Sequence, residues 1–547
     1  MFQFNKDIII NTKLGKVRGN KLNHNNKEFF LFKGIPYAHP PIYSLRWKPP
    51  ILWRSNYPED IYDATVYKDR PFELRDFKRV LRKYLYNTFN SFNISALTKY
   101  FTKYVESEDC LYLNILTPIC ERDRIPVIVY LPDTMFHFNN NDDEYLNRDI
   151  VDKDVIVITF NYRMGVFGFY YHKELDKENK SKISGNYGIQ DVACALRWIR
   201  DNIVYYGGDP DNITLMGDGA GANIAMYLIC NRKNEGLFHK AILNSFSFIY
   251  NLRKRTSTSV AICDQLVGQG KNQILRLRKV SAVLINDRYK KLVVNKGRLK
   301  FLAMFGPIVD HTTIIDEPYT IFKNGLQMRI PIIIGKNRCD GDFFFDNGFR
   351  NILRSPIHDE FFKQDNKLDK LKFIYPHIEK NSVVALKRYF DDFMFTMPLY
   401  MIANYHKINN KVYIYEYTHE RDLIEGFYGC SSLYLNNNQR FFTIKKPAHD
   451  VFVDYVCEFA KSNIDLFTSF TMRDNSIWKE CKTGFIIELG RASSTKKVKF
   501  NTHKLLEDRY VSKLILFDKI MDNRVATECA KEVITSIIRK ISMTKNV

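Results

Sequence analysis

The chain has 547 residues, of which 45% are hydrophobic, and a formal net charge of +21. This length and hydrophobic content are ample for a large buried core. No repeat period or long low-complexity tract indicates an array of small modules. No apolar run reaches the roughly 18 residues of a membrane span. We therefore interpret residues 1–547 as a single domain with its core at about 8–540.

The N-terminal segment Met1–Ile10 lacks a basic region followed by a continuous apolar stretch, so no secretory signal is visible. This favours an intracellular location, although the mature part of an exported precursor would look the same.

Short runs of β-branched residues alternate with helical stretches along the chain. The predicted strands are Val127–Leu131, Val155–Phe160, Ile213–Met216, Ala241–Asn244, Ile330–Gly335 and Lys411–Tyr417, and the predicted helices are Val192–Tyr205 and Ala220–Cys230. This alternation predicts an α/β fold with a mostly parallel, twisted sheet covered by helices on both faces. In such sheets the functional site lies at the carboxyl ends of the strands.

The densest basic stretch, Arg276–Lys300, alternates Lys and Arg with apolar residues. It fits either an anionic partner or the solvated faces of helices, and the second interpretation is favoured because no nucleic-acid module is recognisable. The ten cysteines include no close pair with metal-ligand spacing, and the sequence predicts neither a metal site nor a cofactor.

The most informative segment is Gly217-Asp218-Gly219-Ala220-Gly221 between a predicted strand and a predicted helix. It has the frame of a nucleophile elbow, Gly-x-Ser-x-Gly, in which a strained turn exposes a central nucleophile. The central residue here is Gly219. Glycine adopts such a conformation without penalty, so we expect the turn to persist without a nucleophile.

Several motifs in the same order along the chain are similar to those of the type-B carboxylesterase/cholinesterase family. They are Lys33–Pro41, Leu45–Trp47, Ser107–Ile115, Asn161–Phe169, Gly185–Asp191, Ala195–Ile199, Gly207–Pro210, the elbow, Phe305–Asp310 and Pro331–Asn337. The resemblance implies the α/β-hydrolase fold and a Ser-Glu-His triad. The C-terminal third departs most from the family pattern.

The resemblance places Gly219 at the nucleophile and Asp340, in Asn337–Gly341, at the acid. The base belongs after the strand at 412–417, where Gly426-Phe-Tyr-Gly429 places Tyr428. His419 sits at the end of that strand, and His449 is the rival for the base, although it requires a deletion before Phe459–Lys461. Asp340 is then interpreted as a remaining structural hydrogen-bonding group.

The family's oxyanion loop is a glycine-rich run after the strand at 127–131. Here the run begins Pro132, Asp133, Thr134 and continues to Phe136. Proline has no N–H to donate, and the permissive glycines are replaced by residues with side chains. Loss of a single oxyanion donor typically costs a hundredfold or more in rate.

Structural features of the family pattern persist. The resemblance implies two buried ion pairs, Arg46 with Glu108 and Arg163 with Asp191. Cys110 matches a family cysteine, but the chain has no cysteine before it to complete the family's disulfide. The family is usually secreted or membrane-anchored, whereas the lost cysteines fit a reducing compartment or strong sequence drift.

These features favour an inactive carboxylesterase homologue that acts as a binding or adhesion-type protein, as in the family's neuroligin and neurotactin members. Its partner would be a protein or an anionic surface. The alternatives are a carboxylic-ester hydrolase with a non-standard site, for example Ser245 or Ser247, and a decaying duplicate without a selected role.

Overall fold

The computed structural model describes residues 3–24, 27–74, 105–119, 124–137, 148–179, 182–247, 257–296, 305–337, 340–344, 375, 382–417, 446–462, 469–471, 477–479, 485–489 and 500–504. Within this part of the chain, every helix is too short or too polar to traverse a bilayer.

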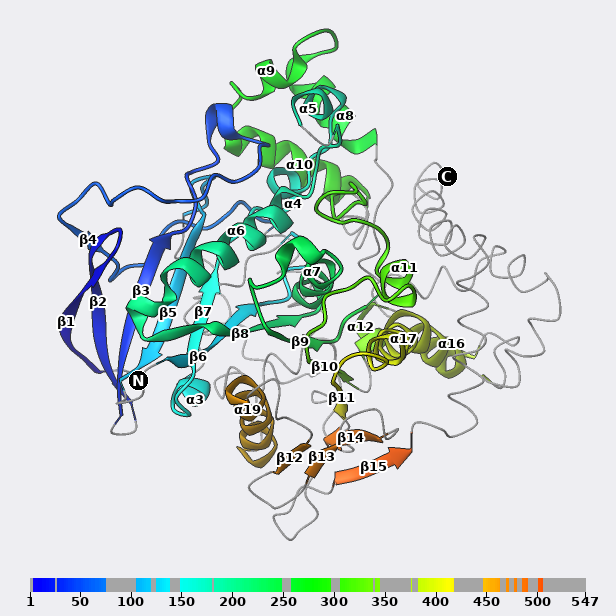
Figure 1. Ribbon diagram of the computed structural model, residues 1–547. Helices are drawn as coiled ribbons and strands as arrows, with labels where there is room; N and C mark the ends of the chain where they lie inside the picture. The colour runs from blue at the N-terminus through cyan, green and yellow to red at the C-terminus, as the bar shows by residue number, and fades with distance from the viewer. Residues whose placement is uncertain are drawn as a thin grey trace, which may run out of the picture.

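One large sheet organises the described residues (Figure 1). Its strands are β1 (Gln3–Thr12), β2 (Gly15–His24), β3 (Lys27–Pro36), β4 (Ile61–Asp63), β5 (Tyr112–Pro118), β6 (Ile125–Leu131), β7 (Ile156–Phe160), β8 (Gly208–Asp218), β9 (Lys240–Asn244), β10 (Ile332–Asn337), β11 (Val412–Tyr417), β14 (Phe485–Leu489) and β15 (Phe500–Lys504). Their order is β1-β2-β3-β5-β7-β6-β8-β9-β10-β11-β14-β15, with β4 beside β2. A separate two-stranded sheet pairs β12 (Ser469–Thr471) with β13 (Ile477–Lys479).

The sheet is mixed. Strands from β7 through β6, β8, β9, β10 and β11 to β14 are parallel, whereas β1, β2, β3, β5 and β7 pair antiparallel, as do β14 and β15. The prediction of a mostly parallel α/β sheet is confirmed for the centre, and the N-terminal antiparallel strands extend it.

Helices cover both faces of the sheet (Figure 1). They are α3 (Arg148–Val151), α4 (Gly165–Gly168), α5 (Lys173–Glu178), α6 (Tyr187–Asn202), α7 (Ala220–Ile229), α8 (Ser257–Val267), α9 (Gln273–Leu277), α10 (Ala282–Lys296), α11 (Pro318–Lys323), α12 (Asp340–Phe344), α16 (Val383–Asp391), α17 (Met397–His406) and α19 (Lys446–Lys461). Helices α6 and α7 lie on one face, and α3 and α19 lie on the other.

The alternation of side chains in β6 shows why both faces carry helices. Val127, Val129 and Leu131 belong to the larger hydrophobic core, which includes α6 and α7. Ile128 and Tyr130 belong to the second core, which includes α3 and α19. Successive side chains of a strand point to opposite faces, so a fully apolar strand is stable only when both faces are covered.

The predicted elements are present with shifted ends. The strand predicted at 213–216 extends over Gly208–Asp218, and the helix predicted at 192–205 begins at Tyr187 and ends at Asn202, where a short 3₁₀ helix, Ile203–Tyr206, continues it. The elbow prediction is confirmed, because β8 ends at Asp218 and α7 begins at Ala220.

Candidate functional site: a nucleophile elbow without a nucleophile

Gly219 forms the turn between β8 and α7. Its backbone has φ 52° and ψ −113°, a region that residues with a side chain rarely occupy. Its N–H donates to the carbonyl oxygen of Asn244 at 2.9 Å, which holds the turn against the neighbouring strand β9. The backbone therefore has an elbow conformation, while the residue at its apex carries no side chain.

The flanking glycines are required by close backbone packing. A Cβ atom on Gly217 would lie 2.4 Å from the carbonyl carbon of Gly221, and a Cβ on Gly221 would lie 2.1 Å from the carbonyl oxygen of Leu131. Both distances are far inside van der Waals contact. Gly217 and Gly221 thus let α7 begin directly against the end of β6.

The sheet register brings the other predicted positions to the same edge. Leu131 is paired with Gly217, Asp218 with Asn244, and Asn244 with Gly335, so the carboxyl ends of β6, β8, β9 and β10 are adjacent. The residues that follow these ends are Pro132 and Asp133, Gly219, Ser245, and Asp340.

Asp340 is fully buried at the start of α12 and is hydrogen-bonded to its neighbours. Its Oδ2 accepts from the backbone N–H of Asn337 and its Oδ1 from Asn337 Nδ2, both at 2.9 Å. Burial raises the pKa of Asp340 to about 7, against the opposing effects of Lys336 and of hydrogen bonds from Asn337 and Ser245. The Asp340 carboxylate is therefore hydrogen-bonded to Asn337, whereas the acid of a working triad is hydrogen-bonded to the base and orients it.

The position predicted for the base, Tyr428, lies outside the described residues, as does His419. His449 lies in α19, which packs against β6 and β8 on the face opposite α7. The structure therefore brings together the nucleophile, acid and oxyanion-loop positions, and the assignment of Tyr428 remains a prediction.

The donors of the oxyanion loop are used within the protein. The backbone N–H of Met135 donates to Asp133 Oδ1 at 3.1 Å, and that of Phe136 donates to Thr134 Oγ1 at 3.2 Å. Met135 and Phe136 have positive φ values of 45° and 64°. The side chains of Asp133 and Thr134 thus accept from backbone N–H groups two residues later in the same loop.

The backbone N–H of Ala220 is the donor that follows the nucleophile position in an elbow. It donates to Asp133 Oδ1 at 2.9 Å. Asp133 was identified from sequence only as a residue that disrupts the oxyanion loop. Its bond to α7 connects residues 87 positions apart and has no signal in the local sequence.

A buried polar network lies beneath the elbow. Asp218 accepts hydrogen bonds from Tyr130 Oη and, at 2.6 Å, from Asn244 Nδ2, and Tyr415 Oη donates to Asn244 Oδ1 at 2.6 Å. Burial raises the pKa of Asp218 to about 7, although the bonds from Tyr130 and Asn244 lower it. The network fixes the end of β8 that precedes Gly219.

Both predicted ion pairs are present and buried. Arg46 donates to Glu108 at 2.6 Å through Nε and Nη2, and Arg163 Nη2 contacts Asp191 Oδ1 at 2.6 Å. Cys110 is free and buried, as predicted. A third buried pair, Lys336 Nζ with Asp391 Oδ2 at 2.6 Å, connects β10 to α16 and was not predicted.

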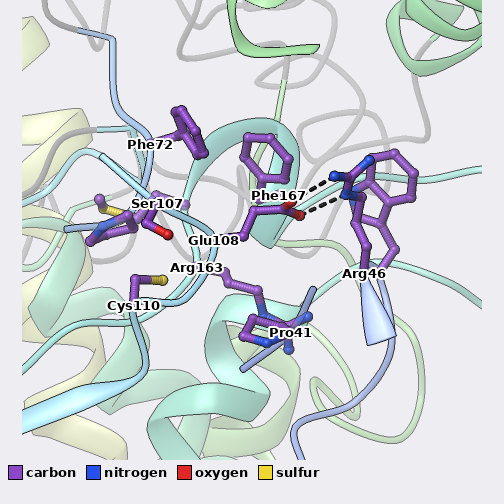
Figure 2. A pocket seen from close by; sticks show the side chains of 11 residues that line it. Pro41, Arg46, Phe72, Ser107, Glu108, Cys110, Arg163 and Phe167 are labelled. Carbon is purple, nitrogen blue, oxygen red and sulfur yellow. Dashed lines mark hydrogen bonds and ion pairs between the residues drawn. The ribbon is translucent and has the colours of Figure 1, made fainter. Parts of the chain in front are cut away.

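A small hollow opens beside the Arg46–Glu108 pair (Figure 2). Phe72, Phe167 and Cys110 line it together with the charged pair. Within the described residues, no group of three or more His, Cys, Asp or Glu side chains could hold a metal ion.

Residues 6–485 match the model of the carboxylesterase family. The chain belongs to this family. Carboxylesterase structures share its fold: a structure of PNB esterase superposes with a TM-score of 0.72 at 25% identity, covering 92% of this chain and 99% of that one. A carboxylesterase of Geobacillus stearothermophilus superposes with a TM-score of 0.70 at 21% identity over the same shares.

Related sequences include proteins named as esterases and one that is not. Para-nitrobenzyl esterase of Bacillus subtilis is 32% identical over 62% of this carboxylesterase-family chain, and the match spans 64% of the esterase, less than two thirds of its length. Mouse cholinesterase is 29% identical over 71% of the chain and 62% of the enzyme. Mouse neuroligin-2 is 29% identical over 62% of the chain and 42% of its own length.

Proposed function

We propose that this carboxylesterase-family protein is catalytically inactive at the family's serine site and acts as a non-catalytic binding or adhesion-type protein. The observation that carries the proposal is the conformation of Gly219. Its φ of 52° keeps the elbow, and its lack of a side chain removes the atom that would attack an ester.

Two further observations support the loss of ester hydrolysis. The Ala220 N–H donates to the Asp133 carboxylate, which would repel a developing oxyanion. The Asp340 carboxylate accepts two hydrogen bonds from Asn337, a group that cannot act as a general base. These defects act on one transition state, so repair of a single defect should recover little activity.

A binding role is supported by the parts of the scaffold that are kept. The buried pairs Arg46–Glu108 and Arg163–Asp191 fix the loops around the sheet, and removal of one partner of such a pair typically costs about 3–5 kcal/mol. The match to neuroligin-2 adds a relative that is not named as an esterase. We infer a protein partner or an anionic surface that contacts the protein away from the elbow.

The second candidate is a carboxylic-ester hydrolase with a non-standard nucleophile, because several matched relatives are named esterases. Ser245 and Ser247 follow β9 at the same edge of the sheet. Both are buried: Ser245 Oγ accepts from Asn337 Nδ2 at 3.3 Å, and Ser247 Oγ has no hydrogen-bond partner in the described part of the chain. Neither hydroxyl bonds a histidine among the described residues, so neither has a visible base.

An activity assay on the full chain separates the two candidates. We expect no hydrolysis of p-nitrophenyl acetate above a heat-denatured control and no adduct with an organophosphonate serine probe by intact-mass spectrometry. Turnover that disappears in Ser245→Ala or Ser247→Ala, with a probe adduct on the same serine, would support the hydrolase and contradict the inactive protein.

A further inference from the structure

The start of α7 presents an N–H that its own helix cannot satisfy. Ala220 is the first residue of a ten-residue helix, and the N–H groups of a first turn have no acceptor within the helix. Gly219 N–H is already bonded to Asn244 O, and no side chain of the helix caps this end. The acceptor for Ala220 comes from a different part of the chain, the half-buried Asp133.

Two donors converge on one carboxylate oxygen. Asp133 Oδ1 lies 2.9 Å from Ala220 N and 3.1 Å from Met135 N, one donor from the elbow and one from the oxyanion loop. This is the arrangement by which an elbow holds an oxyanion: backbone donors from two segments that point to a single oxygen. The positive end of α7 adds a favourable interaction with negative charge.

The loop that carries Asp133 is fixed by contacts that do not involve this carboxylate. Thr134 Oγ1 and Tyr162 Oη are hydrogen-bonded at 2.6 Å, Gly165 N–H donates to Phe136 O at 2.7 Å, and Tyr289 Oη lies 2.5 Å from His137 Nδ1. The backbone of the loop is therefore supported independently, and loss of the Asp133 carboxylate alone should leave its donors in place.

We propose that the Asp133 carboxylate is the resident anion of the former oxyanion site. The Ala220 N–H and the Met135 N–H of the same chain donate to this carboxylate. It stabilises the start of α7 and prevents carboxylates and other anions in the solvent from binding at these donors. This assignment adds to the reasons for inactivity in the proposed function, but it is tested through the bonding of Asp133 and not through turnover, so the activity assay and the experiments below fail separately.

Rescue by a small carboxylate tests the assignment. In Asp133→Gly we expect a lower Tm, because two donors lose their acceptor, and a Tm that rises with sodium formate above an equal concentration of sodium chloride. The wild-type protein should show the same Tm in both salts. The proposal would be overturned if the Tm of Asp133→Gly were the same in formate and in chloride. It would also be overturned if formate raised the Tm of the wild type as much as that of the variant.

Hydrogen exchange provides a second test if Asp133→Gly does not fold. Asp133→Asn keeps the shape and removes the charge, and bonds to charged groups are about twice as strong as neutral ones. We expect the Ala220 amide to exchange roughly tenfold faster in this variant. Asp201→Asn, which alters a surface carboxylate bonded to the neighbouring Arg200, should leave it unchanged. Identical exchange at Ala220 in wild type and Asp133→Asn would overturn the proposal.

Discussion

The carbonyl oxygen of Leu131 lies 2.1 Å from the position that a Cβ atom on Gly221 would occupy. The end of β6 and the first turn of α7 are thus in backbone contact, and neither can move away without disturbing the elbow. We expect Gly221→Ala to lower the free energy of unfolding by about 3 kcal/mol or more, since the clash is with backbone and not with a flexible side chain.

Urea denaturation of Gly221→Ala and Gly236→Ala separates this clash from ordinary glycine replacement. Gly236 has a φ of 78° with nothing within 4 Å of its Cβ position, so its substitution costs only the left-handed conformation, about 1–2 kcal/mol. Equal losses in the two variants would contradict the packing described for the elbow.

The buried pair of Arg163 and Asp191 should be costly to break. Asp191→Ala leaves a guanidinium that is 3% exposed without its carboxylate, and we expect a loss of about 3–5 kcal/mol in the free energy of unfolding. The control is Asp211→Ala. The Asp211 side chain is 77% exposed and forms an ion pair with Arg124, so its removal should cost less than about 1 kcal/mol. A small effect of Asp191→Ala would contradict a structural role for this pair.

The Asp218 carboxyl should make stability depend on pH. Its pKa is raised by burial from 3.8 to about 7, so the folded state retains a proton that the unfolded state has lost between these values. The contribution of Asp218 is therefore complete below about pH 4 and is lost as the pH rises to about 7.

Asp218→Asn cannot ionise and should not show this loss. We expect its Tm, relative to wild type, to increase between pH 5 and about 8 when both proteins are measured in the same buffers. Asp340, whose pKa is also raised to about 7, titrates in both proteins and cancels in the difference. A difference in Tm that is constant with pH would show that Asp218 is ionised throughout.

Local sequence signals were enough for the centre of the fold and for the elbow. Runs of β-branched residues predicted β6 and β7, a short apolar run predicted β9, and the spacing of Gly217, Gly219 and Gly221 predicted the turn. These features depend on residues that are near one another in the chain. The polar alternation of β1 and β2 carries a weaker signal, because these strands are partly exposed at the edge of the sheet.

The contacts that define the site are long-range and could not be predicted in this way. Asp133 and Ala220 are 87 positions apart, and Lys336 and Asp391 are 55 apart. Whether a charged side chain points into the site or into solvent depends on the backbone of its loop, in which Met135 and Phe136 have positive φ values. The sequence identified Pro132, Asp133 and Thr134 as departures from a glycine-rich loop but not what their side chains bind.

The most direct test of the central claim restores the missing nucleophile. Gly219→Ser and the control Gly219→Ala place a side chain at a φ of 52°, so both carry the same backbone strain and differ only in the hydroxyl. Each variant is assayed with p-nitrophenyl acetate and an organophosphonate serine probe, with the labelled residue mapped by mass spectrometry. We predict no turnover and no adduct at position 219 in either variant, because the Ala220 donor is held by Asp133 and the Asp340 carboxylate by Asn337. Clear turnover with a probe adduct on the new serine of Gly219→Ser would contradict the account, since it would require a working base and oxyanion site.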